Sequence, residues 1–212
     1  MHHVMFDIDG TLVQSVEFDG TCYFEAVYEV LGHRLDTNWG NYTFVSDAGI
    51  LDQHIREHGL IAKRDEIHAA VREVFIFKIA SQVKNAPVQE VSGAAALLAE
   101  LRRQGDISVS IATGGWLETA LIKLESAGID VSGIPIASSN DHYSRVKIMK
   151  IAAARAAIAK GVSCTYFGDG EWDKQACEEL GYSFVLVGEK SFHDPCILDF
   201  SNIDRVLAFI GV

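Results

Sequence analysis

The stretch VMFDIDGTLV, residues 4–13, runs from apolar residues into two aspartates, Asp7 and Asp9, followed by Gly10 and Thr11. Its first three residues have the composition of a buried strand. Burying an unpaired carboxylate is costly, so two aspartates at the end of a core strand need a partner that neutralises them. The stretch therefore predicts a strand that ends at a polar site.

The composition is that of a folded globular chain. The 212 residues are 49% hydrophobic and 22% charged, and 18 Lys and Arg against 29 Asp and Glu give a net charge of -11. This acidic balance argues against a nucleic-acid partner, because proteins that bind nucleic acids usually carry a basic face. No apolar stretch reaches the roughly 20 residues that span a bilayer. We expect a cytoplasmic monomer or homodimer without a membrane partner.

The four cysteines have no CxxC spacing, which argues against a zinc site or a disulfide framework built from them. The eight histidines likewise show no pairing typical of a metal site. His54 and His58 are spaced as on one side of a helix, and we interpret them as part of a polar face.

The order of predicted elements indicates the fold. After the first strand, helices are expected at 21–31, 50–59 and 63–83, without strands between them. From residue 88 on, strands at 107–115, 133–138, 162–170 and 182–188 alternate with helices at 94–102, 117–128, 144–161, 173–181 and 203–211. This alternation predicts an α/β fold, a doubly wound parallel Rossmann-like sheet with helices on both faces. Residues 1–14 and 88–212 would form the core, and 15–87 a small all-helical cap inserted after the first strand.

Three of the predicted strands end in polar motifs: DIDGT at 7–11, ATGG at 112–115 and GDGEWD at 168–173. Ligands of doubly wound sheets bind at the carboxyl ends of the strands, where these motifs should meet. Together they supply the hydroxyl of Thr113 and four carboxylates, from Asp7, Asp9, Asp169 and Asp173. Because so many carboxylates repel one another, a hard divalent cation such as Mg²⁺ is expected among them.

The same motifs resemble those of the haloacid dehalogenase superfamily, in its phosphoglycolate phosphatase and β-phosphoglucomutase branch. DIDGTL is similar to the family's DxDGT opening, SIATGG to its strand that ends in threonine, and TYFGDGEWD to its GDxxxD motif. The predicted helical insert lies where this branch has its cap. The resemblance implies a Mg²⁺-dependent phosphatase that hydrolyses a small phosphorylated metabolite through an aspartyl-phosphate.

The resemblance also implies a role for each motif residue. Asp7 would be the nucleophile, and Asp9 the acid that protonates the leaving alcohol and later the base that activates water. Dehalogenases of the family lack the second aspartate, so Asp9 favours phosphate chemistry. The metal ligands would be Asp7, Asp9, Asp169 and Asp173. The phosphate ligands would be Gly10, Thr11, Thr113, Gly114 and a basic residue, Arg145 or Lys147. The family commonly has Lys-Pro at that last place, whereas this chain has SRVK, and we favour Arg145 over Lys147.

Three alternatives stay open at this point. A phosphomutase would carry the same motifs, and a non-catalytic phosphate-binding module would have no need for all the acidic residues. A phosphonatase would need a cap lysine, and neither Lys63 nor Lys78 has a matching context. Weaker candidates for substrate selection in the cap are Asp47, Gly49, His54 and Arg56, and Trp116 could line the pocket or pack in the core.

Overall fold

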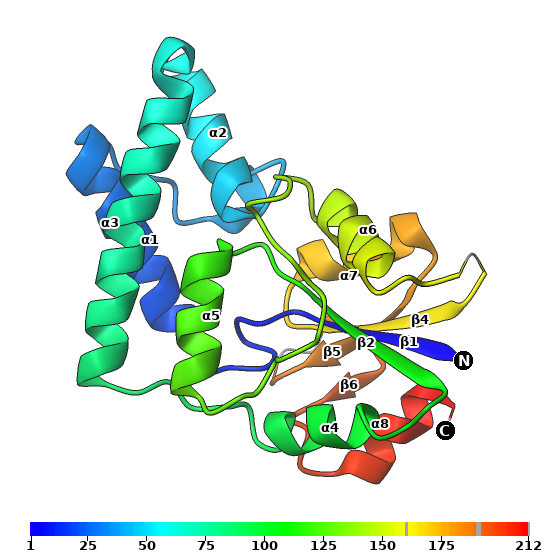
Figure 1. Cartoon of the computed structure of the whole chain (residues 1–212). Coiled ribbons are helices and arrows are strands. Elements are labelled where there is room, and N and C mark those ends of the chain that lie inside the picture. Colours follow the sequence, from blue (N-terminus) through cyan, green and yellow to red (C-terminus); the bar gives the residue numbers. More distant parts are fainter. Residues whose placement is uncertain (160, 190–191, 212) are drawn as a thin grey trace.

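The computed structural model describes residues 1–159, 161–189 and 192–211. Within them one parallel sheet has the strand order β3-β2-β1-β4-β5-β6 (Figure 1). The strands are β1 (His2–Phe6), β2 (Ile107–Ala112), β3 (Ile136–Ala137), β4 (Ser163–Gly168), β5 (Ser183–Val187) and β6 (Cys196–Ile197). The order reverses at β1, as in doubly wound folds, and this confirms the predicted α/β fold.

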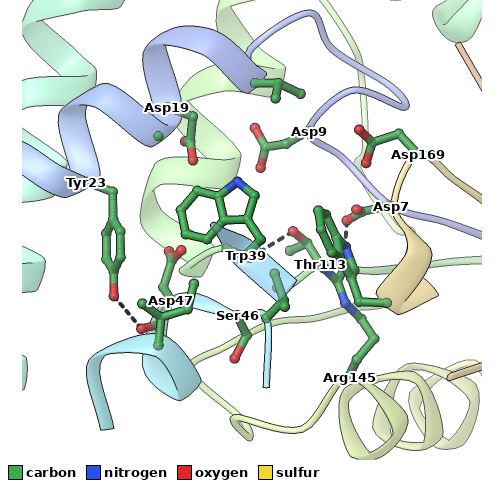
Figure 2. A pocket seen from close by; sticks show the side chains of 17 residues that line it. Asp7, Asp9, Asp19, Tyr23, Trp39, Ser46, Asp47, Thr113, Arg145 and Asp169 are labelled. Carbon is green, nitrogen blue, oxygen red and sulfur yellow. Dashed lines mark hydrogen bonds and ion pairs between the residues drawn. The ribbon is translucent and has the colours of Figure 1, made fainter. Parts of the chain in front are cut away.

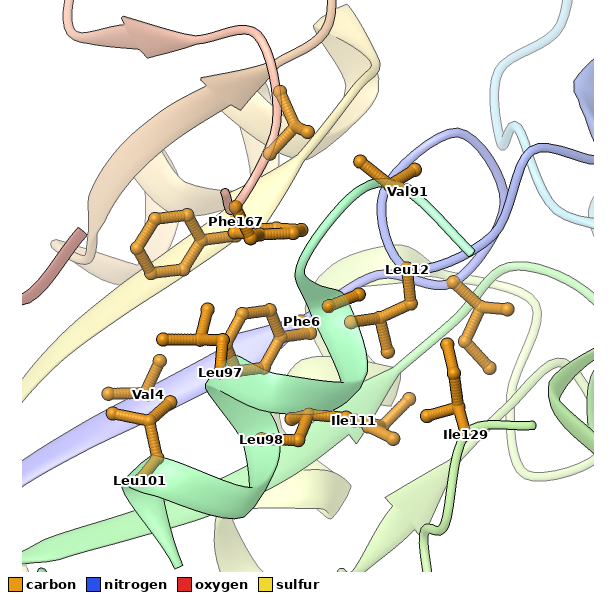
Figure 3. Close-up of a cluster of buried hydrophobic side chains, with 14 of the residues drawn as sticks. Val4, Phe6, Leu12, Val91, Leu97, Leu98, Leu101, Ile111, Ile129 and Phe167 are labelled. Carbon is orange, nitrogen blue, oxygen red and sulfur yellow. The ribbon is translucent and has the colours of Figure 1, made fainter. Parts of the chain in front are cut away.

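Alternate residues of the strands point to opposite faces of the sheet. Val4 and Phe6 of β1 belong to one buried cluster, and Met5 belongs to another. The first cluster packs against the helices α4 (Ala94–Leu101), α5 (Leu117–Ser126) and α8 (Ile203–Ile210). The second packs against α6 (Arg145–Arg155) and α7 (Glu171–Leu180). Figure 3 shows Leu97 of α4 next to Phe6, and Leu98 next to Ile111, in the first cluster. Both faces of the sheet are therefore covered, and the polar groups are left at the strand ends.

The segment between β1 and β2 is helical. It contains α1 (Val16–Leu31), α2 (Asp47–Glu57) and α3 (Arg64–Asn85), with short 3-10 helices at Trp39–Asn41 and Ile61–Lys63. Their buried side chains form another hydrophobic cluster, which includes Tyr23 and Phe75 and which Trp116 joins from the region after β2. In Figure 1 they gather to one side of the sheet, and α3 packs against α5. A separate cluster supports the proposed division into a core, 1–14 and 88–212, and a cap, 15–87.

Several element boundaries differ from the expectations. α1 begins at Val16, because Glu17 and Asp19 in its first turn stabilise the start of a helix. α6 ends at Arg155, ahead of Ala157, whose φ of 53° is left-handed; residue 160 of the expected helix lies outside the described residues. β6 has only two residues, too few for a strand pattern. None of the described helices is long and apolar enough to cross a membrane.

Candidate active site

Three neighbouring strands bring the predicted polar motifs to one place (Figure 2). Phe6 of β1 is in register with Ile111 of β2 and Phe167 of β4, so the residues that follow each strand lie side by side. The backbone N–H of Asp7 continues this pairing, and it donates to the carbonyl of Phe167 at 2.9 Å. As a result Asp7, Thr113 and Asp169 line the same cavity.

The carboxylates of Asp7, Asp169 and Asp173 form a tight group. One oxygen from each lies within 4.8 Å of the others, and all three residues are buried. Burial raises the pKa of Asp7 well above its ordinary value; Arg145 opposes this shift, and the charges of Asp173 and Asp169 add to it. Burial likewise raises the pKa of Asp173 to about 6, against the effect of Arg145. These carboxylates repel one another when all of them are charged, and a cation between them would remove that repulsion. Their oxygen atoms are the ligands that a hard divalent cation such as Mg²⁺ prefers.

Arg145 is the basic residue that reaches this group. It is the first residue of α6, and its Nη1 lies 3.2 Å from Oδ1 of Asp7, while its Nε lies 3.4 Å from Oδ1 of Asp173. Burial alone would lower the pKa of Arg145, but Asp173 and Asp7 outweigh it and raise the pKa, so the guanidinium stays charged. Lys147 is exposed and does not line the cavity. Of the two predicted phosphate-binding cations, the fold brings Arg145 to the aspartates.

The glycines of the motifs allow close approach of groups at the site. A Cβ at Gly114 would lie 2.7 Å from Nη2 of Arg145, so a larger residue there would displace the guanidinium from its present position. Gly10 has a φ of +72°, and a Cβ there would lie 2.5 Å from Oδ2 of Asp169. Thr113 is buried, and its Oγ1 accepts the N–H of Gly115 at 3.1 Å. Thr11 is fully buried and is not among the residues that line the cavity, and its backbone N–H donates to the carbonyl of Ile8 at 3.1 Å in the turn after β1.

Asp9 lies in the same cavity but outside the tight carboxylate group. Its Oδ1 accepts a hydrogen bond from Ser15 Oγ and lies 2.5 Å from Nζ of Lys123, a lysine with no exposed surface. The same Nζ lies 2.6 Å from Oδ1 of Asp19 in α1. The side chain of Asp9 is therefore held by Ser15 and Lys123, apart from the carboxylates that fit a cation.

Lys123 and Asp19 were not among the predicted site residues. A signal for Lys123 was present, because it lies on the buried side of α5 with Ala120 and Leu124, where a lysine needs a buried partner. The sequence does not say which carboxylate that partner is. Asp19 carried no signal beyond its place in the first turn of a helix.

The helical segment supplies the other wall of the cavity, which has a volume of about 180 Å³. This wall is largely apolar and aromatic, with Asp19 and Asp47 as acidic members. The cavity residues from this segment are Val16, Asp19, Gly20, Tyr23, Trp39, Val45, Ser46, Asp47 and Ile50, and Trp172 of α7 completes the wall.

Of the four predicted cap residues, Asp47 is the one that lines the cavity. Its Oδ2 accepts the backbone N–H of Trp116 at 2.8 Å, and its carbonyl accepts the hydroxyl of Tyr23 at 2.6 Å. Burial, with the charge of Asp19, raises the pKa of Asp47 well above its ordinary value. The Trp116 ring packs with Tyr23 and Phe75 in the helical cluster.

The other predicted cap residues do not line the cavity. A Cβ at Gly49 would lie 2.6 Å from the carbonyl oxygen of Phe44, so this glycine serves chain packing. Arg56 is exposed, and His54 is buried away from the cavity among other histidines.

Comparison with known proteins adds a family and a set of similar folds. The model of haloacid dehalogenase-like hydrolases matches residues 1–181. A hydrolase from Pseudomonas syringae has a TM-score of 0.76 at 20% identity, and the match covers 100% of both chains. CbbY from Rhodobacter sphaeroides, solved in complex with phosphate, has a TM-score of 0.71 at 18% identity over 96% of each chain.

A β-phosphoglucomutase from Clostridium difficile has a TM-score of 0.74 at 14% identity, over 98% of this chain and 96% of its own. Identities this low show a shared fold and no more. No curated protein matches the sequence.

Proposed function

Because the chain belongs to the haloacid dehalogenase-like hydrolases, we propose that it is a Mg²⁺-dependent phosphatase acting on a small phosphomonoester. The observation that carries this proposal is the meeting of Asp7, Asp9 and Arg145 on one cavity, beside a carboxylate group that fits a divalent cation. The solved structure of CbbY with phosphate supports it, since that protein shares the fold. The cavity volume of about 180 Å³ suits a small substrate.

In the proposed first step, an oxygen of Asp7 attacks the phosphorus atom and the bond to the leaving alcohol breaks. Arg145, next to Oδ1 of Asp7, would bind a phosphate oxygen and align it with the nucleophile. The leaving oxygen would take its proton from Asp9, whose carboxylate Ser15 and Lys123 orient. Mg²⁺ bound by Asp7, Asp169 and Asp173 would supply positive charge beside the phosphate oxygens.

In the second step, water attacks the phosphorus of the aspartyl-phosphate while Asp9 takes up the proton of that water. The bond between phosphorus and Asp7 breaks, which restores the carboxylate and releases inorganic phosphate. The wall from the helical segment would exclude bulk water during both steps.

The first test is the substitution Asp7→Asn. An amide at this position is a far weaker nucleophile, so we expect Mg²⁺-dependent hydrolysis of an aryl phosphate to fall at least about 1000-fold. The variant should unfold at the same or a higher denaturant concentration, since one crowded carboxylate is removed. The control is Asp204→Asn, an exposed aspartate of α8, which should leave hydrolysis unchanged. Undiminished hydrolysis by Asp7→Asn would rule the mechanism out.

A panel of phosphomonoesters should accompany this test, with sugar phosphates, phosphoglycolate and nucleotides as substrates. A phosphomutase would use the same residues and return the phosphoryl group to a sugar. Release of inorganic phosphate supports the phosphatase, whereas an isomeric sugar phosphate as the main product would replace it with a mutase.

A further inference from the structure

Three histidines meet at the end of the helical segment remote from the candidate active site. His33 follows the C-terminus of α1, His54 lies in the last turn of α2, and His58 is the residue at which α2 ends. The ring centroids of His54 and His58 are 4.0 Å apart, and those of His33 and His58 are 4.5 Å apart. At about 1.5 Å per residue, His58 lies about 16 Å along the helix from Asp47 of the cavity. These side chains therefore form a cluster of their own.

This cluster overturns the expectation that the histidines show no metal-like grouping. One ring nitrogen from each of the three lies within 4.8 Å of the others. His54 and His58 sit at i and i+4 on one helix, a spacing that lets two histidines bind one metal ion. The third member, His33, comes from another helix end, and the sequence pattern could not place it beside them.

Two ring nitrogens in the cluster lack a partner. Nε2 of His54 and Nδ1 of His33 are both buried, and neither has a hydrogen bond among the described residues. His54 itself is only 4% exposed. A buried nitrogen without a hydrogen-bond partner is energetically unfavourable. Stacked imidazoles alone do not relieve this cost, whereas a bound ion would.

The tautomer of His58 also suits metal binding. Its Nδ1 lies 2.9 Å from the backbone carbonyl of His54, and a carbonyl only accepts, so Nδ1 carries the proton. The lone pair is then on Nε2, and a hydrogen bond of this kind orients a metal-binding imidazole. His58 is exposed, which gives an ion a path to the cluster.

We propose that His33, His54 and His58 form a second metal site, for Zn²⁺ or a similar borderline transition-metal ion. Imidazole nitrogens select such ions, whereas the carboxylate group of the active site suits Mg²⁺. Two ligands on α2 and one after α1 would join the ends of these helices, so the ion would stabilise the helical segment. The three rings have to turn so that each nitrogen comes within about 2.0–2.1 Å of the ion.

The test is Zn²⁺ titration of chelator-treated full-length protein by calorimetry, with saturating Mg²⁺ present to occupy the carboxylate group. We expect one Zn²⁺ per chain, and visible absorption bands when Co²⁺ replaces it. His58→Gln and His33→Asn should each weaken binding about 100-fold or more, because changing even a residue that orients a ligand costs 10–100-fold. Zn²⁺ at 100 times its dissociation constant should raise the midpoint of thermal unfolding by about 5–10 °C, in wild type only.

The matched control is His193→Asn, a histidine of the core whose Nε2 lies 3.1 Å from the carbonyl of Phe184, which should bind Zn²⁺ like wild type. His58 is exposed, so its substitution should leave the fold and the phosphatase activity with Mg²⁺ intact. Equal Zn²⁺ affinity in wild type, His58→Gln and His33→Asn would overturn the proposal, as would the absence of Zn²⁺ binding in saturating Mg²⁺. Neither result depends on the proposed phosphatase function.

Discussion

The ammonium group of Lys123 lies between the carboxylates of Asp9 and Asp19, at 2.5 Å and 2.6 Å, with no exposed surface. Burial alone would lower the pKa of this lysine, but Asp19 and Asp9 outweigh it and raise the pKa. Burial also raises the pKa of Asp19 to about 6, although Lys123 opposes the shift. Lys123 therefore compensates the two partly buried carboxylates, and removing its charge leaves them without a cation.

Lys123→Met should accordingly lower the free energy of unfolding by about 3–5 kcal/mol at pH 7, measured by urea denaturation. The double variant Lys123→Met/Asp19→Asn should regain part of this loss, because one of the two unpaired carboxylates is gone. Lys84→Met, at an exposed position of α3, should stay within about 0.5 kcal/mol of wild type. If Lys123→Met is as stable as wild type, the ion pairs of Lys123 contribute nothing to the free energy of unfolding.

At the scale of elements, β1 is the strand that places Asp7, the proposed nucleophile, and it is held from both sides by β2 and β4. His3 of β1 is fully buried against β2, with its ring nitrogens 2.7 Å from Ser108 Oγ and 2.9 Å from Ser110 Oγ. Burial lowers the pKa of His3 to about 4. His3 therefore joins β1 to β2 through its side chain in the neutral form of the imidazole.

This pairing predicts a pH dependence of stability. Between pH 4 and 6.5 the unfolded chain protonates His3 and the folded chain does not, so stability rises with pH over this window and levels off above it. Between these two pH values, His3 changes the free energy of unfolding by about 3 kcal/mol. In His3→Gln, unfolding free energies from denaturant titrations should rise less steeply from pH 4.5 to 6.5. Above pH 6.5 the two proteins should follow parallel curves, and parallel curves below it would exclude His3 as the cause.

At the scale of the whole molecule, the cavity exists because the helical segment closes over the strand ends. Trp39 of this segment lines the cavity and stacks on Phe24 at 5.2 Å, while Trp172 comes from the core. The phosphate would lie among the motif residues and the organic part of the substrate against the aromatic wall. A mutation in the aromatic wall should then weaken binding of the organic part without weakening binding of the phosphate.

Trp39→Ala should raise KM for the best phosphomonoester about tenfold, which corresponds to about 1.4 kcal/mol of lost apolar contact. The inhibition constant of inorganic phosphate should change less than about twofold, because phosphate alone does not reach this wall. Tyr28→Ala, an exposed aromatic of α1 outside the cavity, serves as the control in steady-state assays. An equal loss of phosphate and substrate binding would place Trp39 at the phosphate itself.

Much of the candidate site could be predicted from short motifs. Asp7, Thr113 and Asp169 follow three strands that a parallel sheet aligns at one edge, so their meeting needed only the correct element order. Side-chain direction was harder to predict. Asp9 directly precedes the predicted turn at Gly10 and Thr11, and its carboxylate pairs with Lys123 and lies outside the group formed by Asp7, Asp169 and Asp173.

The sequence by itself determined the α/β order and the strand-end motifs, including the second aspartate on which the proposal of phosphate chemistry rests, because these depend on residues close together in the chain. Only the tertiary structure decided the partners of isolated residues. Lys123 pairs with Asp9 across 114 positions, and His33 joins His54 and His58 from another helix. Such contacts carry no local periodicity, since they result from how whole helices pack against one another and against the sheet.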